Sequence, residues 1–260
     1  MKPSVAAATV EAKRPLVIAH RGNSKVAPEN TLPAFASAVQ VGVDFVELDY
    51  CHTADGSLVV FHDKTLDRCT DACQQWGGKK IPLAAKSLAE IRLLDAGSWF
   101  EPQFAGTRIP TLEEALDVIQ PGSMTLIEHK SGDAAACFEL LQRKQVVPRV
   151  AVQAFDWSYL ADLHQLAPEM VLGALGDKKL TPKQLAEIMA CGARFVGWNH
   201  EELTKADIDN LHAQGLKVWC YTVDDPKTAR RLLDWGIDGL ISNVPARMKE
   251  VVAERGRATK

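Results

Sequence analysis

Short apolar runs alternate with longer amphipathic segments along almost the whole chain. The first run, PLVIAH at 15–20, ends in a histidine and is followed by Arg-Gly. Apolar runs of this length, bounded by polar or turn residues, are typical of strands buried in a parallel sheet. We predict strands at 15–20, in the first half of 45–63, and at 124–130, 149–155, 171–175, 194–199, 217–222 and 239–242.

The amphipathic segments carry the start and stop signals of helices. Asn30 or Thr31 can cap a helix that ends at Gly42. Thr111 and Glu114 have the spacing of a capping box, in which each residue satisfies a main-chain N–H of the other. We predict helices at 31–42, 87–95, 111–120, 134–144 and 158–166, from 181, after 204, and at 226–235 and 246–254.

Eight strands, most of them separated by helices, are the pattern of an α/β fold of the (β/α)8 TIM-barrel type. The chain of 260 residues is close to the ~250 residues typical of that barrel. A doubly wound open sheet is the alternative, but no glycine fingerprint follows the first strand. We predict a disordered leader at 1–14 and one barrel domain at 15–255, with an insertion at about 64–110.

The segment 45–63 is predicted to form a strand, a tight Asp-Gly turn and a returning strand. If the turn places Thr53 opposite Leu58, the same register places Asp49 opposite His62. Residues that lie directly opposite on one face of a hairpin have Cβ atoms ~5 Å apart. The hairpin would therefore bring a carboxylate and an imidazole together, and a slip of one residue would break this geometry.

Polar side chains follow several of the predicted strands at the point where each strand ends. Glu47 and Asp49 are two residues apart, so both face the same side of the second strand. In a (β/α)8 barrel the C-terminal strand ends meet at one mouth, where the functional groups lie. The side chains expected there are His20, Arg21, Glu47, Asp49, His62, Glu128, Lys130 and Tyr221.

Each of these residues has an ordinary structural explanation when it is taken alone. His20 could be a satisfied buried histidine, and Tyr221 could fill the barrel. Glu128 and Lys130 could form an ion pair at a strand end. Residues that serve only the core have no reason to gather at strand ends, so their convergence favours a functional site.

Three carboxylates without a nearby cysteine favour a hard divalent ion, Mg²⁺ or Ca²⁺, over Mn²⁺ or Zn²⁺. Zinc remains an alternative because His20 and His62 could ligate it. Arg21 and Lys130 beside such an ion suit an anionic substrate, above all a phosphate. Two histidines can supply the acid and the base that displace an alcohol from a phosphodiester near neutral pH. Which histidine is the acid stays open.

Composition limits the possible partners. The chain is 47% hydrophobic and has a net charge of −3, which gives no electrostatic reason to bind nucleic acid. No apolar run approaches the ~20 residues that cross a bilayer. The six cysteines are scattered, mostly among apolar neighbours, which fits free thiols in the reducing cytoplasm. Whether the neighbouring Cys69 and Cys73 pair, and which oligomeric state the protein has, stay open.

Several motifs resemble those of the glycerophosphodiester phosphodiesterase family, within the phospholipase C-like phosphodiesterase superfamily. They follow the family's order and cover nearly the whole chain from residue 15 to 250. The matching segments are IAHRG at 18–22, PENT at 28–31, VELD at 46–49, DGSLVVFHDKTLDR at 55–68, LDAGSWF at 94–100, IPTLEEAL at 109–116, LIEHK at 126–130 and GIDGLISNVP at 236–245.

The resemblance implies a distorted barrel with a small inserted subdomain, and metal-dependent hydrolysis of glycerophosphodiesters to sn-glycerol 3-phosphate and an alcohol. In related phosphodiesterases of the phospholipase C type, a substrate hydroxyl attacks phosphorus and forms a cyclic phosphate, a part that the glycerol could play here. The implied site residues are the metal ligands Glu47, Asp49 and Glu128, the acid–base pair His20 and His62, and the phosphate-binding Arg21 and Lys130.

Two positions depart from the family's usual residues. Tyr221 stands where the family commonly has tryptophan, so the aromatic group at the barrel mouth is smaller and carries a hydroxyl. Asn243 stands where the family often has aspartate. Both changes bear on substrate preference, and we expect Tyr221 to contact the substrate.

Two other functions compete with hydrolysis of small glycerophosphodiesters. A lysophospholipase D-like phosphodiesterase would need an apolar groove for a lipid chain, which an aromatic insertion could supply. The aromatic residues concerned are Trp76, Trp99, Phe100 and Phe104. A non-catalytic barrel that binds a phosphorylated ligand is the second alternative, because a fold alone does not establish catalysis.

Overall fold

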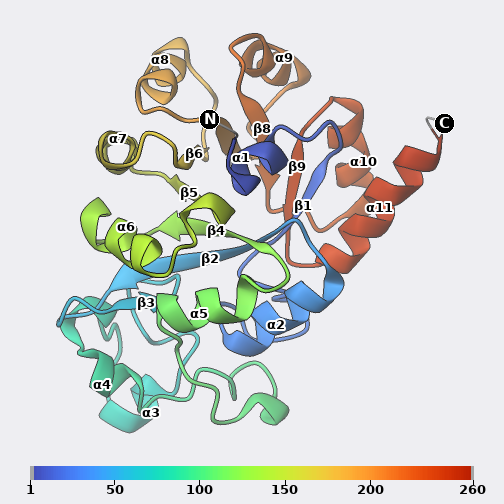
Figure 1. Cartoon of the computed structure of the whole chain (residues 1–260). Helices are drawn as coiled ribbons and strands as arrows, with labels where there is room; N and C mark the ends of the chain where they lie inside the picture. Colours follow the sequence, from blue (N-terminus) through green and yellow to red (C-terminus); the bar gives the residue numbers. More distant parts are fainter. Residues whose placement is uncertain (1–2, 259–260) are drawn as a thin grey trace.

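The computed structural model describes residues 3–258, and its strands close into a barrel (Figure 1). The strand order is β1-β9-β8-β7-β6-β5-β4-β2-β3, and β1 also pairs with β2. All pairs are parallel except β2 with β3, so the predicted (β/α)8 barrel is confirmed. The strands are β1 (Leu16–Ala19), β2 (Phe45–His52), β3 (Leu58–Val60), β4 (Met124–His129), β5 (Val150–Ala154), β6 (Val171–Gly176), β7 (Phe195–Asn199), β8 (Lys217–Tyr221) and β9 (Gly239–Ser242).

Helices surround the barrel and alternate with its strands (Figure 1). Within the described residues, no helix combines the length and the apolar character that a bilayer span requires. The outer helices are α2 (Leu32–Val41), α5 (Leu112–Ile119), α6 (Ala134–Arg143), α7 (Trp157–Leu166), α8 (Pro182–Ala190), α9 (Lys205–Ala213), α10 (Pro226–Asp234) and α11 (Pro245–Ala258).

The helix boundaries follow the predicted caps closely. Thr111 and Glu114 form the predicted capping box at the start of α5. Gly42 ends α2 with a φ of 72°, a left-handed conformation that glycine adopts without strain. Thr31 precedes α2 but makes no capping hydrogen bond with its side chain.

The barrel interior is apolar at one end and acidic at the other. Along β2, Phe45 lies in the apolar end, and Glu47 and Asp49 follow at the alternate positions that also point inward. We call the apolar end the floor cluster. Its buried members are Ala6, Ala7, Val10, Leu16, Ile18, Phe45, Met124, Leu126, Ala151, Val171, Phe195, Trp219 and Ile241.

A helix occupies the N-terminal segment for which the sequence predicts a disordered leader. α1 (Val5–Val10) is capped by Ser4, whose Oγ accepts the N–H of Ala7 at 3.1 Å. Ala6, Ala7 and Val10 are buried in the floor cluster because their small side chains can close the apolar end of the barrel. The leader prediction is therefore wrong for this helix, and residues 1–2 of that leader lie outside the described residues.

The predicted insertion at 64–110 contributes a second, smaller apolar core beside the barrel. It contains two short helices, α3 (Ala72–Trp76) and α4 (Leu88–Ile91), and α4 is shorter than the helix predicted at 87–95. The buried residues of this core are Cys51, Val59, Phe61, Leu66, Cys69, Ala72, Leu83, Ile91, Leu94, Ala96 and Ile109. The insertion thus packs on the β2–β3 hairpin through its own apolar side chains.

The hairpin has a different register from the predicted one. His52, and not Thr53, lies opposite Leu58. The turn is longer because the N–H of Thr53 donates to the carbonyl oxygen of Ser57 at 3.0 Å, and the Thr53 hydroxyl accepts the Ser57 N–H at 2.9 Å. Gly56 closes the loop with a φ of 75°, as in three-residue hairpin loops that end in a left-handed glycine.

The shifted register changes how His62 approaches Asp49. β3 ends at Val60, and the N–H of Phe61 donates to the carbonyl oxygen of Asp49 at 3.0 Å. The predicted cross-strand pair of Asp49 and His62 is therefore wrong. His62 reaches the barrel mouth from the loop that follows β3.

Candidate active site

Three buried carboxylates from two neighbouring strands meet inside the barrel. Glu47 and Asp49 come from β2 and Glu128 from β4, and Asp49 is the register partner of Glu128. One carboxylate oxygen from each residue lies within 4.8 Å of the other two. The three side chains, which we call the carboxylate layer, therefore converge as predicted.

The loop after β1 fixes two members of the carboxylate layer. The N–H of Arg21 donates to Glu47 Oε2 at 2.7 Å, and Arg21 has a left-handed φ of 55°. Gly22 follows with a φ of 83°, and a Cβ there would lie 2.7 Å from the main chain of Ala34. Asn30 donates to Asp49 Oδ2 at 2.7 Å and accepts the Asp49 N–H at 3.1 Å. The His-Arg-Gly and Pro-Glu-Asn-Thr motifs thus shape this site.

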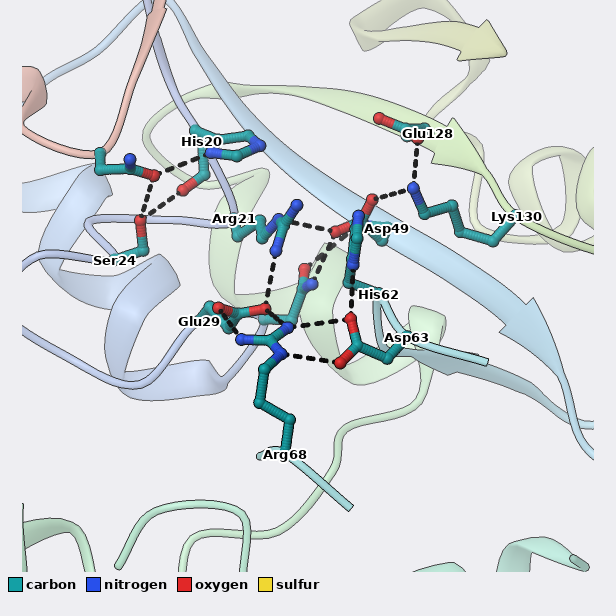
Figure 2. Close-up of polar contacts among 12 residues, drawn as sticks. His20, Arg21, Ser24, Glu29, Asp49, His62, Asp63, Arg68, Glu128 and Lys130 are labelled. Carbon is teal, nitrogen blue, oxygen red and sulfur yellow. Dashed lines mark hydrogen bonds and ion pairs between the residues drawn. The ribbon is translucent and has the colours of Figure 1, made fainter. Parts of the chain in front are cut away.

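Two cations lie against the carboxylate layer (Figure 2). Arg21 Nε lies 3.2 Å from Asp49 Oδ2, and Lys130 Nζ lies 3.3 Å from Asp49 Oδ1. Lys130 also donates to Glu128 Oε1. Burial alone would raise the pKa of Asp49, but the charges of Arg21 and Lys130 hold it below its usual value.

The environment of the two glutamates of this layer disfavours their ionised forms. Burial, and then the negative charge of Asp49, raise the pKa of Glu128 to about 7. Burial and the charges of Asp49 and Glu128 raise the pKa of Glu47 well above its ordinary value. Like charges held together away from water destabilise their ionised forms, so this layer needs additional positive charge when it is fully ionised.

The carboxylate layer fits a divalent metal ion. Within the described residues, Glu47 Oε1 and Asp49 Oδ1 are buried and accept no hydrogen bond, although Lys130 lies near the latter. The mutually close ligand atoms are all carboxylate oxygens, the donors that Mg²⁺ and Ca²⁺ prefer. Neither His20 nor His62 belongs to this close group, so the donor set offers no support for zinc.

His20 follows β1 and has an uncharged partner. Its Nδ1 lies 2.8 Å from Asn243 Oδ1. The orientation of the Asn243 amide is set by its Nδ2, which donates to Asp224 Oδ2 at 2.8 Å. His20 Nδ1 must therefore be the donor, which leaves the lone pair of the neutral ring on Nε2. Burial, followed by the charge of Arg21, lowers the pKa of His20 to about 4.

His62 follows β3 and has a charged partner. Its Nδ1 lies 2.7 Å from Asp63 Oδ1. Asp63 in turn accepts two hydrogen bonds from Arg68, which, with a contribution from His62, lower the pKa of Asp63 to about 2. The two histidines therefore differ in their hydrogen-bond partners, since one contacts an amide and the other a carboxylate.

A cavity of about 190 Å³ opens above the carboxylate layer. Tyr221 and Phe155 meet edge to face on its wall, with ring centroids 6.3 Å apart, and the Tyr221 hydroxyl donates to the Gly176 carbonyl. Nothing from the insertion at 64–110 lines it. Its lining residues are His20, Arg21, His62, Glu128, Lys130, Gln153, Phe155, Leu175, Tyr221, Thr222 and Ile241.

A larger hollow of about 580 Å³ lies elsewhere on the surface, between the chain before β1 and α11. Two of its cations already have partners, because Arg14 pairs with Asp44 and Lys249 donates to the carbonyls of Val41 and Gly42. The smaller cavity is the better candidate site, since titratable side chains line it and one of them, Glu128, belongs to the carboxylate layer.

The structure places all eight predicted site residues at one barrel mouth. Glu29, Asn30 and Asp63, whose side chains hold these residues in place, were not predicted from the sequence as part of the site. Gln153 was not predicted either. Gln153 is buried, lines the cavity, and its Oε1 accepts no hydrogen bond within the described residues. A signal was available, because Gln153 is the one polar residue between apolar neighbours in VAVQAF.

Known proteins resemble this chain over most of its length. A model of the glycerophosphoryl diester phosphodiesterase family matches residues 20–247. A glycerophosphodiester phosphodiesterase of Bacillus subtilis is 35% identical, and the match covers 89% of this chain and 84% of that protein. One of Caldanaerobacter subterraneus subsp. tengcongensis is 34% identical, with 93% of this chain and 99% of that protein covered.

Solved structures agree with these sequence matches. An Oleispira antarctica phosphodiesterase in complex with the product sn-glycerol-3-phosphate has a TM-score of 0.84 at 30% identity, covering 92% of this chain and 97% of that one. A glycerophosphodiester phosphodiesterase from Agrobacterium tumefaciens has a TM-score of 0.75 at 27% identity, covering 92% and 99%. The chain therefore belongs to the glycerophosphoryl diester phosphodiesterase family.

Proposed function

We propose that this protein hydrolyses small glycerophosphodiesters to sn-glycerol 3-phosphate and an alcohol. The observation that carries the proposal is one cavity lined by two histidines, two cations and a carboxylate of the buried layer. These are the groups that phosphodiester cleavage needs, and a structural relative was solved with sn-glycerol-3-phosphate bound.

Glu47, Asp49 and Glu128 would hold one divalent ion, with Mg²⁺ or Ca²⁺ favoured by the all-oxygen donor set. When bound, such an ion supplies positive charge that stabilises the negative charge developing on phosphate oxygens. Arg21 and Lys130 line the same cavity and would bind the remaining phosphate oxygens.

The partners of the two histidines support a division of labour. His20, with Nδ1 donating to an amide and a lowered pKa, is suited to remove a proton with Nε2. It would take the proton of the attacking glycerol hydroxyl while that oxygen bonds to phosphorus, and a water would then open the resulting cyclic phosphate to sn-glycerol 3-phosphate. His62, held by the Asp63 carboxylate, is suited to donate a proton to the leaving alcohol oxygen, which keeps the electron pair of the broken P–O bond.

The dimensions of the cavity favour a small substrate. Its volume of about 190 Å³ is below the roughly 300–1,000 Å³ of pockets for drug-sized ligands. The aromatic residues that could have formed a lipid groove are engaged within the insertion, where Phe100 packs edge to face against Trp99 and Phe104. The lysophospholipase D alternative therefore gains no support from the walls of the cavity.

The decisive experiment measures the release of the alcohol head group, and of sn-glycerol 3-phosphate from the diesters, by metal-free protein after addition of Mg²⁺, Ca²⁺, Mn²⁺ or Zn²⁺. A panel of glycerophosphodiesters and one long-chain lysolipid serve as substrates. We expect turnover of the diesters with a hard divalent ion and little turnover of the lysolipid. Binding without turnover under every condition would favour the non-catalytic alternative, and preference for the lysolipid would favour the lysophospholipase D-like alternative.

Substitution at Asn243 tests the assignment of His20 as the base. Asn243→Asp places a carboxylate against Nδ1 and should raise the pKa of His20, because a negative neighbour favours the imidazolium ion. The acidic limb of the kcat/KM profile should then move to higher pH. A limb that stays in place, in a variant with unchanged melting temperature, would contradict this assignment.

A further inference from the structure

Arg68, a residue of the insertion, contacts side chains that adjoin the active site (Figure 2). Its guanidinium binds two carboxylates at once. It meets Asp63 through Nε at 2.7 Å and Nη2 at 2.9 Å, and Glu29 through Nη1 at 2.9 Å and Nη2 at 2.7 Å. Paired hydrogen bonds of this kind fix both distance and orientation, which a lysine ammonium cannot do.

Each of these carboxylates holds a group that lines the cavity. Asp63 Oδ1 lies 2.7 Å from His62 Nδ1, and Glu29 Oε1 accepts from Arg21 Nη1 at 2.8 Å. Figure 2 shows the resulting chain of polar contacts, which runs from His62 through Asp63, Arg68 and Glu29 to Arg21. All five residues lie in loops, so no strand or helix hydrogen bonds hold their side chains in register.

A purely stabilising role explains this arrangement poorly. Arg68 has a side-chain exposure of 46%, so solvent and salt screen its ion pairs, and both carboxylates that it binds lead inward to groups that line the cavity. An arginine that only anchored the insertion would not need paired hydrogen bonds to two carboxylates that each contact a residue of the active site. The geometry is instead that of an outer support for reacting groups.

We propose that Arg68 is a positioning residue that holds the Asp63 carboxylate so that His62 presents its Nε2–H to the leaving oxygen. This rests on the proposed function. In the step concerned, the P–O bond to the alcohol breaks, its electron pair stays on the alcohol oxygen, and the His62 Nε2 proton moves to that oxygen. His62 becomes neutral and keeps the proton on its Nδ1, which still donates a hydrogen bond to Asp63. Through Glu29, Arg68 also orients Arg21.

The test compares two diesters of glycerol 3-phosphate in the metal-loaded enzyme. An ethanolamine ester has a leaving group that needs a proton, whereas a p-nitrophenyl ester does not. Misplacing Arg21 should slow both substrates equally, and misplacing His62 should slow only the ethanolamine ester. For Arg68→Gln we expect an excess loss of kcat of about 10–100-fold on the ethanolamine ester, the usual range for outer supports. Arg68→Lys should restore part of that loss.

Arg92→Gln is the matched control, because Arg92 pairs with Glu114 in the same part of the chain but contacts none of the cavity residues. It should leave the ratio of the two rates unchanged. Equal losses on both substrates in Arg68→Gln, or the same excess loss in Arg92→Gln, would overturn the proposal. If Arg68→Gln folds poorly, Asp63→Asn breaks the same link and should give the same excess loss.

His62→Ala separates this inference from the function on which it rests. If His62→Ala shows a large excess loss on the ethanolamine ester and folded Arg68→Gln does not, only the role of Arg68 fails. If His62→Ala itself shows no excess loss, its role as the acid fails, and the positioning role of Arg68 fails with it.

Discussion

The floor cluster and the carboxylate layer occupy the same barrel and share the same strands, yet their physical character is opposite. In β2, Phe45 belongs to the floor cluster, whereas Glu47 and Asp49 belong to the carboxylate layer. The floor cluster buries aromatic and aliphatic side chains against one another. The carboxylate layer buries acidic groups, two of whose oxygens accept no hydrogen bond within the described residues, and the pKa values of its two glutamates are raised.

The contrast indicates where this fold gains stability and where it gives stability up. Burial of apolar surface stabilises the folded chain by about 25 cal/mol per Å². Buried like charges without enough counter-charge work against folding. The apolar end of the barrel therefore offsets an acidic end that is built for a ligand, as expected for functional sites that violate the rules of a stable core.

The largest expected effect comes from breaking the floor cluster. Trp219 is fully buried and stacks on Phe195, with centroids 3.9 Å apart. Trp219→Ala should lower the free energy of unfolding by about 3–5 kcal/mol, because the cavity left behind cannot collapse fully. Urea unfolding measures the loss. Trp219→Phe keeps an aromatic ring and removes a buried Nε1–H that lacks a partner within the described residues, so it should cost much less.

A change in the carboxylate layer should lower activity without lowering stability. Glu47→Gln removes a charge whose pKa is raised by burial and by its acidic neighbours. Activity should fall by about 10²–10³-fold, the usual range for losing one electrostatic contact at a reacting centre. Stability in chelator should stay the same or rise. Calorimetric titration with Mg²⁺ should give weaker binding, and Glu139→Gln, at an exposed position, should change neither quantity.

In metal-free protein, the pH dependence of stability should show the cost of ionising the carboxylate layer. Glu128 has a folded pKa of about 7 against an ordinary 4.5, so the folded state holds a proton that the unfolded state has lost between these values. Its contribution to stability therefore falls as pH rises through that window. In chelator, Glu128→Gln should gain stability over the unchanged protein from pH 4.5 to 7, by on the order of 3 kcal/mol at most.

The lowered pKa of His20 changes stability with pH in the direction opposite to that of Glu128. Because His20 is present in both proteins, its contribution cancels when the two are compared. Excess Mg²⁺ should abolish the gain of Glu128→Gln at pH 7.5, since an ion favours the ionised carboxylates and binds only the folded site. A stability difference that does not change with pH in chelator would mean that Glu128 is already ionised and paired.

Periodicity and capping predicted the barrel well. Strands such as β4 and β8 were visible because a parallel strand covered on both faces has to be apolar. The helix start at Thr111 was visible because a capping box satisfies main-chain donors locally. The carboxylate layer was also accessible, since residues two apart in a strand share a face and strand ends meet at one mouth.

The errors arose where side chains or distant contacts decide the geometry. The hairpin register slipped by one residue because the Thr53 hydroxyl completes the turn, which the Asp-Gly signal does not reveal. The network through Asp63 and Arg68 was missed because its members lie in loops, whose side-chain directions follow no period. The helix in the N-terminal segment was missed because six Ala- and Val-rich residues are too short to form a stable helix without a partner.

That helix supplies the last and smallest test of the comparison. Val10 is buried in the floor cluster, whereas Val5 lies on the same helix with 48% of its surface exposed. Val10→Ala removes two buried methyl groups and should lower the free energy of unfolding by about 1.6 kcal/mol, at roughly 0.8 kcal/mol for each carbon. Val5→Ala should be close to neutral. Neither variant should change kcat, because α1 lies at the opposite end of the barrel from the carboxylate layer. Equal stability of the two variants in urea unfolding would mean that α1 does not close the barrel in solution. A drop in kcat for Val10→Ala alone would mean that the floor cluster controls the position of the carboxylates, and the two ends would then act as one unit.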